Sequence, residues 1–366
     1  MKVLLLSAYD AASHQYWRKA LVAQFPQYHF TVLALPARFF SWRIRGNSLT
    51  WAFKHRDMLT QDYDLIIATS MTDLSALKGF VPELANTPSI LYFHENQFAY
   101  PKSGKEFTSV EPQVLNLYGA LAADRVVFNS QYNQNTFLKG CQQLLKKLPD
   151  QVPENLTELL QEKSCVLPVP ILNTAYLNHS GQTGALEIVW NHRWEFDKGP
   201  ELLHRALVKL KQQNVDFKLH LVGQRFRYSP DVFEQIYQEF TGYIGQWGFI
   251  KSKAQYQALL QSSDVVLSTA LHDFQGLAIL EGVAAGCIPL VPNRLAYPEY
   301  FSADYCYQGG EDETDNLVAK LSVLAQQKQA GSLPKSPDIN GLSWQAQRSA
   351  YQELIEDLVR EQAFSD

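Results

Sequence analysis

Short apolar runs rich in β-branched residues alternate with longer stretches of helical periodicity along almost the whole chain. This alternation predicts parallel sheets whose strands are connected by helices. In the first half we expect strands at residues 3–8, 29–35, 64–69, 89–94, 125–130 and 165–169. The pattern then restarts, with strands expected at 186–191, 217–223, 264–269 and 287–292. Helices fill the intervals, for example 201–213, where apolar residues recur three and four positions apart.

The two series of strands predict two domains. A chain of 366 residues is long enough for two α/β domains, each with a core of its own. We expect the first domain to span 1–175 and to be completed by a last helix over 343–366, and the second to span 185–342. In such sheets ligands bind beyond the carboxyl ends of the strands, which predicts a ligand cleft between the domains.

Composition excludes several classes of protein. Charged residues make up 19% of the chain, and no apolar run is as long as a membrane span, so we expect no integral membrane association. The four cysteines lie far apart without a C-x-x-C spacing. This argues against a zinc site and a disulfide framework, and predicts a reducing, cytoplasmic location.

An acidic pair brackets the junction between an expected strand and an expected helix. In HDFQGLAILEGVAAG, residues 272–286, Asp273 precedes Glu281 by eight positions. Helix N-termini present free N–H groups and a positive dipole end, which suit a phosphate, and Gly276 allows close approach of backbone. Both carboxylates could accept hydrogen bonds from sugar hydroxyls, which predicts a nucleotide-sugar site. The alternative is a surface loop and helix whose two acids are solvated.

Two cations follow the first strand of the second half. Arg193 and Lys198 lie five apart in NHRWEFDKGPELL, residues 191–203, before a helix that Pro200 can begin. Fixed cations there would stabilise a diphosphate leaving group as its charge develops. The alternative is a surface turn with solvated side chains.

His94 ends an expected strand of the first half, in ILYFHENQ, residues 90–97. A histidine there could donate a hydrogen bond to a donor sugar or phosphate, or it could be a partly buried structural histidine.

The segment from Ala11 to Arg56 contains no acidic residue. Its seven basic residues are Arg18, Lys19, Arg38, Arg43, Arg45, Lys54 and Arg56, and its aromatic residues include Phe39, Trp42 and Phe53. Basic side chains neutralise phosphates and aromatic rings stack on bases, so this segment favours RNA binding. Chance clustering combined with core aromatics is the alternative.

Together these motifs resemble a known family. The spacing of Asp273 and Glu281 and the Arg193–Lys198 pair resemble those of retaining glycosyltransferases of family 4, which have the GT-B fold. The runs ILYFHENQ, VVFNSQYN (126–133), VWNHRWEFDKGPE (189–201) and LHDFQGLAILEGVAAGCIPLVPNRLAYPEYF (271–301) resemble the tRNA-queuosine α-mannosyltransferase family. Two departures stand out: Asp273 replaces the first Glu of the motif, and Ala11-Ala12 replaces a Gly-Gly pair.

The resemblance implies an α/β protein of the GT-B fold, with two Rossmann-like domains facing across a cleft. It implies transfer of mannose from GDP-mannose to the cyclopentenediol of queuosine in tRNA, without a metal or cofactor. Arg193 and Lys198 would neutralise the diphosphate, Glu281 would bind the ribose, Asp273 would orient the hexose, and His94 would face the donor sugar.

Two further sets of residues follow from the resemblance. The donor would also contact Phe274, Gln275, Gly276, Leu277, Gly248, Phe249, Ile250 and Ser13. The anticodon arm of the tRNA would contact Arg38, Trp42, Arg43, Arg45, Lys54, Arg56 and Asn96. Other functions stay open: a related transferase with another sugar nucleotide or with a lipid or polysaccharide acceptor, a non-catalytic RNA-binding protein, and a nucleotide-sugar epimerase.

Overall fold

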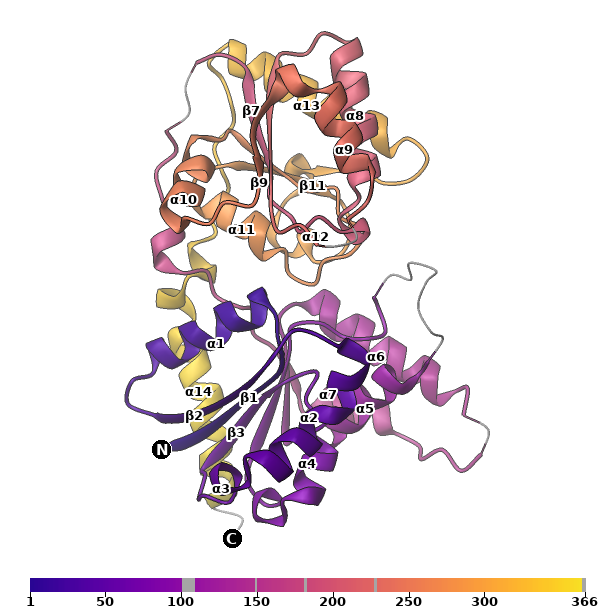
Figure 1. Cartoon of the computed structure of the whole chain (residues 1–366), viewed down its shortest axis with the longest axis vertical. Helices are drawn as coiled ribbons and strands as arrows, with labels where there is room; N and C mark the ends of the chain where they lie inside the picture. The colour runs from indigo at the N-terminus through magenta and orange to yellow at the C-terminus, as the bar shows by residue number, and fades with distance from the viewer. Residues whose placement is uncertain (101–108, 149, 181–182, 227–228, 364–366) are drawn as a thin grey trace. The chain divides into compact units, whose positions relative to one another are not determined.

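The computed structural model describes residues 1–100, 109–148, 150–180, 183–226 and 229–363 (Figure 1). The chain divides into two compact units: Met1–Pro170 joined by the segment from Trp344 onward, and Ile171–Ser343. The chain therefore passes from the first unit into the second at Ile171, five residues before the boundary expected from the sequence. There the Ile171 amide donates to the Leu342 carbonyl at 2.8 Å, so the outgoing and returning chains pair beside each other.

The first unit is built on a parallel six-stranded sheet of order β2-β1-β3-β4-β5-β6. Its strands are β1 (Lys2–Asp10), β2 (His29–Pro36), β3 (Leu65–Thr69), β4 (Ser89–Phe93), β5 (Arg125–Phe128) and β6 (Ser164–Val166). The order reverses between β1 and β3, which is the topological switch point of this sheet.

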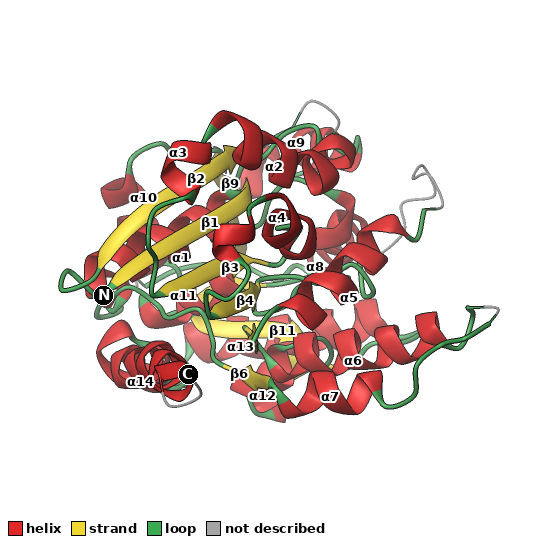
Figure 2. Ribbon diagram, turned by 90° about the horizontal axis from the view of Figure 1, so that it is seen from below, coloured by secondary structure: helices red, strands yellow, loops and turns green. Residues whose placement is uncertain are grey.

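Helices cover both faces of this sheet (Figure 2). On one face lie α2 (Phe40–Lys54), α4 (Leu74–Phe80), α5 (Glu111–Ala122), α6 (Gln131–Leu145) and α7 (Leu156–Glu162), and their apolar side chains form one continuous core with the strands. A single helical turn, α3 (Arg56–Leu59), follows α2. On the other face lie α1 (Ala12–Gln24) and the last helix, α14 (Trp344–Ala363).

The second unit contains a parallel sheet of order β12-β11-β10-β7-β8-β9. Its strands are β7 (Leu186–Trp190), β8 (Phe217–Val222), β9 (Ile244–Gly248), β10 (Val265–Leu267), β11 (Ile288–Pro292) and β12 (Cys306–Tyr307). This is the order of dinucleotide-binding Rossmann sheets, and its switch point lies between β7 and β10.

Each face of the second sheet also has a core. One core includes α8 (Pro200–Gln212), α9 (Val232–Glu239) and α13 (Glu313–Gln329), and the other includes α10 (Lys253–Ser262), α11 (Leu277–Ala284) and α12 (Tyr297–Tyr300). Sheets covered on both faces require strands that are apolar on both sides, which is why the strands read as continuous apolar runs.

All ten strands expected from sequence are present, and two more complete the second sheet. The additional strands, β9 and β12, are its edges. β9 reads IGQWG and is only partly buried, while β12 has two residues. Their sequence signal is weak because β9 has no continuous apolar run and β12 is too short to show one. Among the described residues, no helix is both long enough and apolar enough to cross a membrane.

Candidate functional site

The two predicted donor motifs meet at the switch point of the second sheet. Arg193 and Lys198 lie in the loop that follows β7, and Asp273 lies in the loop that follows β10. Because β7 and β10 are neighbours in a parallel sheet, their carboxyl ends share one edge. A switch point at that edge is where open α/β sheets bind ligands.

Lys198 is the cationic centre of this edge. Its Nζ donates to the His272 carbonyl at 2.7 Å and lies 3.5 Å from Asp273 Oδ2 and 3.4 Å from Asp197 Oδ2. The side chain is 9% exposed. A buried ammonium placed between two carboxylates has a fixed direction, and it needs little reorganisation to meet a phosphate.

Asp273 is held on both of its oxygens. Oδ1 accepts the Gly276 amide at 2.9 Å, and Oδ2 accepts the Tyr297 hydroxyl at 3.3 Å in addition to the Lys198 contact. Burial raises the pKa of this carboxyl, but Lys198 and the Gly276 amide outweigh it and the pKa falls to about 2. Asp273 is therefore ionised and orients Lys198, a contact the sequence did not predict.

Backbone contacts join the two loops. The Asp197 carbonyl accepts the amides of Leu271 at 2.8 Å and His272 at 3.1 Å, and Thr269 Oγ1 donates to the Lys198 carbonyl at 2.8 Å. Gly199 has a φ of 63°, and a Cβ atom there would lie 2.1 Å from the Thr269 carbonyl oxygen. Only glycine allows this approach, which is the local reason for the DKGP sequence.

Sequence reasoning missed two histidines beside Lys198. His192 and His272 are buried, and burial together with the Lys198 charge lowers their pKa values to about 3 and about 4. Both are therefore neutral at pH 7. His192 Nε2 has no hydrogen-bond partner among the described residues. The sequence contained one indication that His192 belongs to the site: it lies next to Arg193, directly after the expected strand 186–191.

Arg193 is more exposed than Lys198. Its guanidinium pairs with Glu195 at 2.9 Å, and its charge contributes to the low pKa values of both histidines. It therefore lies in the same electrostatic environment as Lys198. The proposed contacts of both cations with a diphosphate stay predictions.

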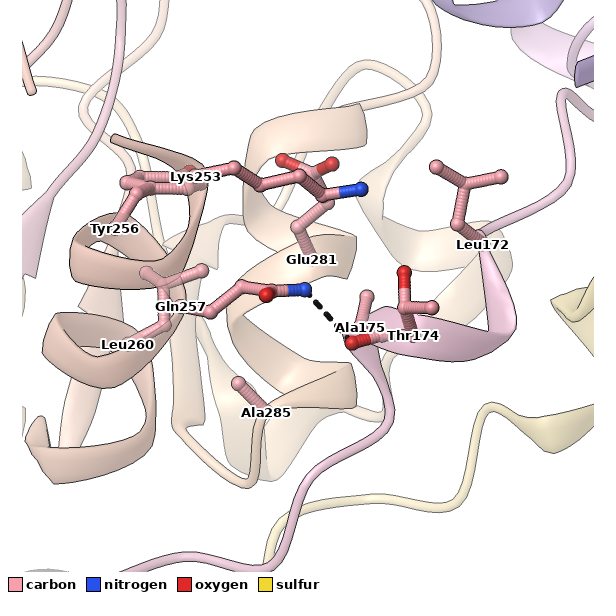
Figure 3. A pocket seen from close by; sticks show the side chains of 9 residues that line it. All are labelled: Leu172, Thr174, Ala175, Lys253, Tyr256, Gln257, Leu260, Glu281 and Ala285. Carbon is pink, nitrogen blue, oxygen red and sulfur yellow. Dashed lines mark hydrogen bonds between the residues drawn. The ribbon is translucent and has the colours of Figure 1, made fainter. Parts of the chain in front are cut away.

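Glu281 lies in α11 at the rim of a small pocket (Figure 3). Side chains of α10 and α11 face Leu172 and Thr174 across this pocket. The Tyr256 hydroxyl hydrogen-bonds Glu281 and accepts the Asn191 amide at 2.9 Å, which links Glu281 to the end of β7. Burial raises the Glu281 pKa to about 7, although Lys253 and Tyr256 oppose this shift.

The remaining predicted donor residues of this unit differ in exposure. Phe274 and Gln275 are buried, Gly276 precedes α11 with a φ of 79°, and Leu277 begins that helix. Gly248 ends β9, Phe249 is exposed, and Ile250 packs on the second core. Their predicted contacts with the donor are untested.

In the first unit, His94 follows β4 within a group of aromatic rings. Its ring centroid lies 4.3 Å from His14, 4.8 Å from Tyr92 and 5.0 Å from Trp17. Neither of its ring nitrogens hydrogen-bonds to a described residue, and burial, reinforced by His14, lowers its pKa well below the usual range. His94 is therefore a neutral imidazole with free hydrogen-bonding capacity.

The loop after β1 accommodates its alanines without strain. Ala11 has φ −66° and ψ 168°, an extended conformation open to any residue. The replacement of Gly-Gly by Ala11-Ala12 therefore needs no unusual backbone. Ser13 lies exposed in the first turn of α1.

The predicted RNA-binding residues fall into three groups. Arg38, Trp42 and Lys54 are exposed on or just before α2. Arg45 pairs with Asp73 at 3.2 Å and Glu111 at 2.8 Å, and Arg56 pairs with Glu83 at 3.1 Å. Arg43 and Asn96 are buried.

Asn96 has a structural role in this fold. Its Nδ2 donates to the side chains of Asn133 and Thr136, at 2.8 and 2.9 Å, and its Oδ1 accepts the amides of Phe98 and Ala99. An amide satisfied in this way inside the protein does not favour the predicted contact with RNA.

Potential metal ligands were also considered. Over the ranges that the structure describes, no group of three or more His, Cys, Asp or Glu side chains is arranged to hold a metal ion.

Comparisons with known proteins identify the family of the chain. A family model described as "tRNA-queuosine alpha-mannosyltransferase N-terminal" matches residues 2–171, and one described as "Glycosyl transferases group 1" matches residues 181–330. The tRNA-queuosine alpha-mannosyltransferase of Drosophila melanogaster is 31% identical over 330 residues, which cover 87% of this chain and 85% of the fly protein.

Solved structures extend the likeness of fold. Sucrose-phosphate synthase from Thermosynechococcus elongatus superposes with a TM-score of 0.68 and 12% identity, covering 98% of this chain and 99% of that one. Anabaena HepE in complex with UDP gives 0.62 and 16%, covering 97% and 99%. The fold is thus the predicted GT-B fold. The chain is a glycosyltransferase and belongs to the tRNA-queuosine alpha-mannosyltransferase family.

Proposed function

We propose that this protein transfers mannose from GDP-mannose to the cyclopentenediol of queuosine in tRNA, in the cytoplasm. The observation that carries this proposal is the 31% identity to the fly enzyme over 87% of the chain, together with the family model over the first unit. The donor motifs at the β7–β10 switch point support a nucleotide-sugar substrate.

The charges at this switch point support departure of a diphosphate. In the proposed reaction the bond from the sugar C1 to the diphosphate oxygen breaks, and a bond from C1 to a queuosine hydroxyl oxygen forms on the same face. The leaving phosphate takes the proton of that hydroxyl, and GDP departs. Lys198 and Arg193 stabilise the negative charge as it develops. Since two side chains supply this positive charge, we propose that no metal is required.

The other site residues have supporting roles in this proposal. Asp273 holds Lys198 in place and orients the hexose, and Glu281 accepts hydrogen bonds from the ribose. His94, a neutral imidazole, donates to the donor sugar. Retention of the anomeric configuration follows from same-face attack and is proposed by analogy with the family.

Mass spectrometry of tRNA nucleosides tests the proposal directly. Queuosine-containing tRNA is incubated with the purified protein and, in separate reactions, GDP-mannose, UDP-glucose and UDP-galactose, each with and without EDTA. We expect a hexose on queuosine with GDP-mannose alone, and equal yields with EDTA. Transfer from another donor would correct the sugar, and loss of activity with EDTA would overturn the metal-free mechanism. No modified nucleoside with any donor would overturn the acceptor.

A further inference from the structure

The start of α2 combines a buried cation with exposed aromatic rings. Arg43 lies in the first turn of this helix and is 8% exposed. Its Nε is buried without a hydrogen-bond partner, and Arg43 forms no ion pair with a described residue. A buried guanidinium nitrogen without a partner is costly, so the residue is suited to an anion that joins it on binding.

The position of Arg43 points to a ligand. Asn47, one helical turn further on, donates to the Met71 carbonyl at 3.1 Å, and its Oδ1 accepts the Asp73 amide at 3.1 Å. Residues four apart share a helix face, so Arg43 lies on the face that packs against the loop after β3. That loop leaves the carboxyl edge of the sheet next to the β1–β3 switch point. The Thr72 hydroxyl in it is buried and has no hydrogen-bond partner among the described residues.

Two aromatic rings lie beside this cation. Phe39 precedes α2 in a left-handed conformation, with φ 54° and ψ 55°, and the residue is 71% exposed. Such a conformation is unfavourable for a residue with a side chain and is typical of functional sites. The Arg38 guanidinium lies 5.6 Å from the centre of this ring.

Trp42 lies flat on its own helix. A Cβ atom at Gly46 would come within 2.4 Å of the indole, so the glycine makes room for the ring. One side of the ring lies on the helix and the opposite side faces solvent, so that the residue is 57% exposed. An exposed, oriented indole next to a cationic site is the arrangement that proteins use to stack an unpaired base.

We propose that the start of α2 is a nucleotide-binding site for single-stranded RNA. A backbone phosphate binds the Arg43 guanidinium and the free amides at the helix N-terminus, and the adjacent base stacks on Trp42 or Phe39. The absence of acidic residues from Ala11 to Arg56 makes the surrounding segment complementary to a polyanion. This inference rests on the proposed function, because it names the part of the protein that holds the tRNA loop.

Binding of a fluorescent, queuosine-containing anticodon stem-loop, measured by anisotropy at several salt concentrations, tests the site. We expect Arg43→Gln to weaken binding about tenfold or more and to reduce the slope of log affinity against log salt by about one. Trp42→Ala should weaken binding about tenfold with an unchanged slope, because stacking involves no counterion release. The control is Arg125→Gln, since Arg125 begins β5, where the amino ends of the parallel strands lie, and pairs with Glu361. It should alter affinity less than twofold.

Thermal unfolding of the free protein separates a binding role from a structural one. Because the described residues give Arg43 Nε no partner, Arg43→Gln should unfold at the wild-type temperature or above it. A melting temperature lower by several degrees would mean that the guanidinium is paired without RNA, and would overturn the site. The proposed site would also be wrong if Arg43→Gln kept the wild-type affinity and salt slope. A change of oligomeric state in Trp42→Ala would overturn the site as well.

The outcomes also distinguish this site from the proposed function. If the wild type glycosylates queuosine while Arg43→Gln keeps the same KM for the RNA, the site alone is wrong. If the wild type binds GDP but does not bind the stem-loop, the tRNA acceptor and the site are both wrong.

Discussion

At the scale of single residues, Lys198 is the charge on which the proposed activation of the donor depends. We expect Lys198→Ala to lower kcat/KM by two to four decades, or about 3–5 kcal/mol of transition-state stabilisation. Lys328→Ala is the matched control, because that side chain is similarly buried, at 8% exposure, and pairs with Asp264 at 2.6 Å. It should lower the melting temperature while the activity of the folded protein persists. Steady-state transfer kinetics would contradict the assignment if Lys198→Ala stayed within threefold of the wild type.

If Glu281 binds the donor as proposed, donor binding should depend on pH. Burial raises its pKa from 4.5 to about 7, so the carboxylate that is proposed to bind ribose forms as the pH rises through 7. We expect GDP affinity, measured by calorimetry, to increase between pH 6 and pH 8 in the wild type. Glu281→Gln should show weaker binding that hardly changes over this range. Equal pH profiles for the two proteins would remove Glu281 from the donor site.

The same group has the opposite effect on stability. The native Glu281 carboxyl keeps a proton that the unfolded chain loses near pH 4.5, so stability falls as the pH rises from 4.5 through 7. The loss is on the order of 2 kcal/mol after allowance for partial solvent access. Glu281→Gln should therefore raise the melting temperature at pH 8 more than at pH 5.5. A gain that is equal at both values would show that burial does not perturb this carboxyl.

At the scale of elements, Gly199 determines how the loop after β7 meets the end of β10. A methyl group there would lie 2.1 Å from the Thr269 carbonyl oxygen, and its φ of 63° is unfavourable for alanine. We expect Gly199→Ala to destabilise the second unit by about 2–4 kcal/mol and to displace Lys198. Gly242→Ala is the control, because a methyl group at Gly242 would have no neighbour within 4 Å. Denaturant unfolding and transfer assays should show lower stability and lower activity for Gly199→Ala, and near wild-type values for Gly242→Ala.

At the scale of the whole molecule, the end of the chain stabilises the unit in which the chain begins. Tyr351 in α14 accepts the Trp17 indole N–H at 3.0 Å and donates to the Pro168 carbonyl at 3.0 Å. We expect Tyr351→Ala to destabilise the first unit by about 3–5 kcal/mol, and Tyr351→Phe by about 1–2 kcal/mol. Calorimetry should show a lower transition for the first unit while that of the second persists. A shift of the second unit alone would contradict this assignment.

Local sequence determined most of the architecture, because it rests on short-range patterns. Apolar runs of five to seven residues identified ten strands, and their regular alternation with helices identified two parallel sheets. Polar and glycine residues directly after those strands located the donor motifs, since the carboxyl ends of parallel strands must lie together. The strands β9 and β12 were missed because β9, which reads IGQWG, has no continuous apolar run and β12 has only two residues.

Tertiary structure alone decided which of these side chains are buried and which are paired. Lys198 and Asp273 lie 75 residues apart and meet only because β7 and β10 are neighbours. Arg43 and Trp42 are adjacent in sequence, but the packing of α2 buries the first and exposes the second. Charge and aromatic content therefore predicted an RNA-binding segment. Its geometry depended on the face that the helix presents to the sheet, which the local pattern does not encode.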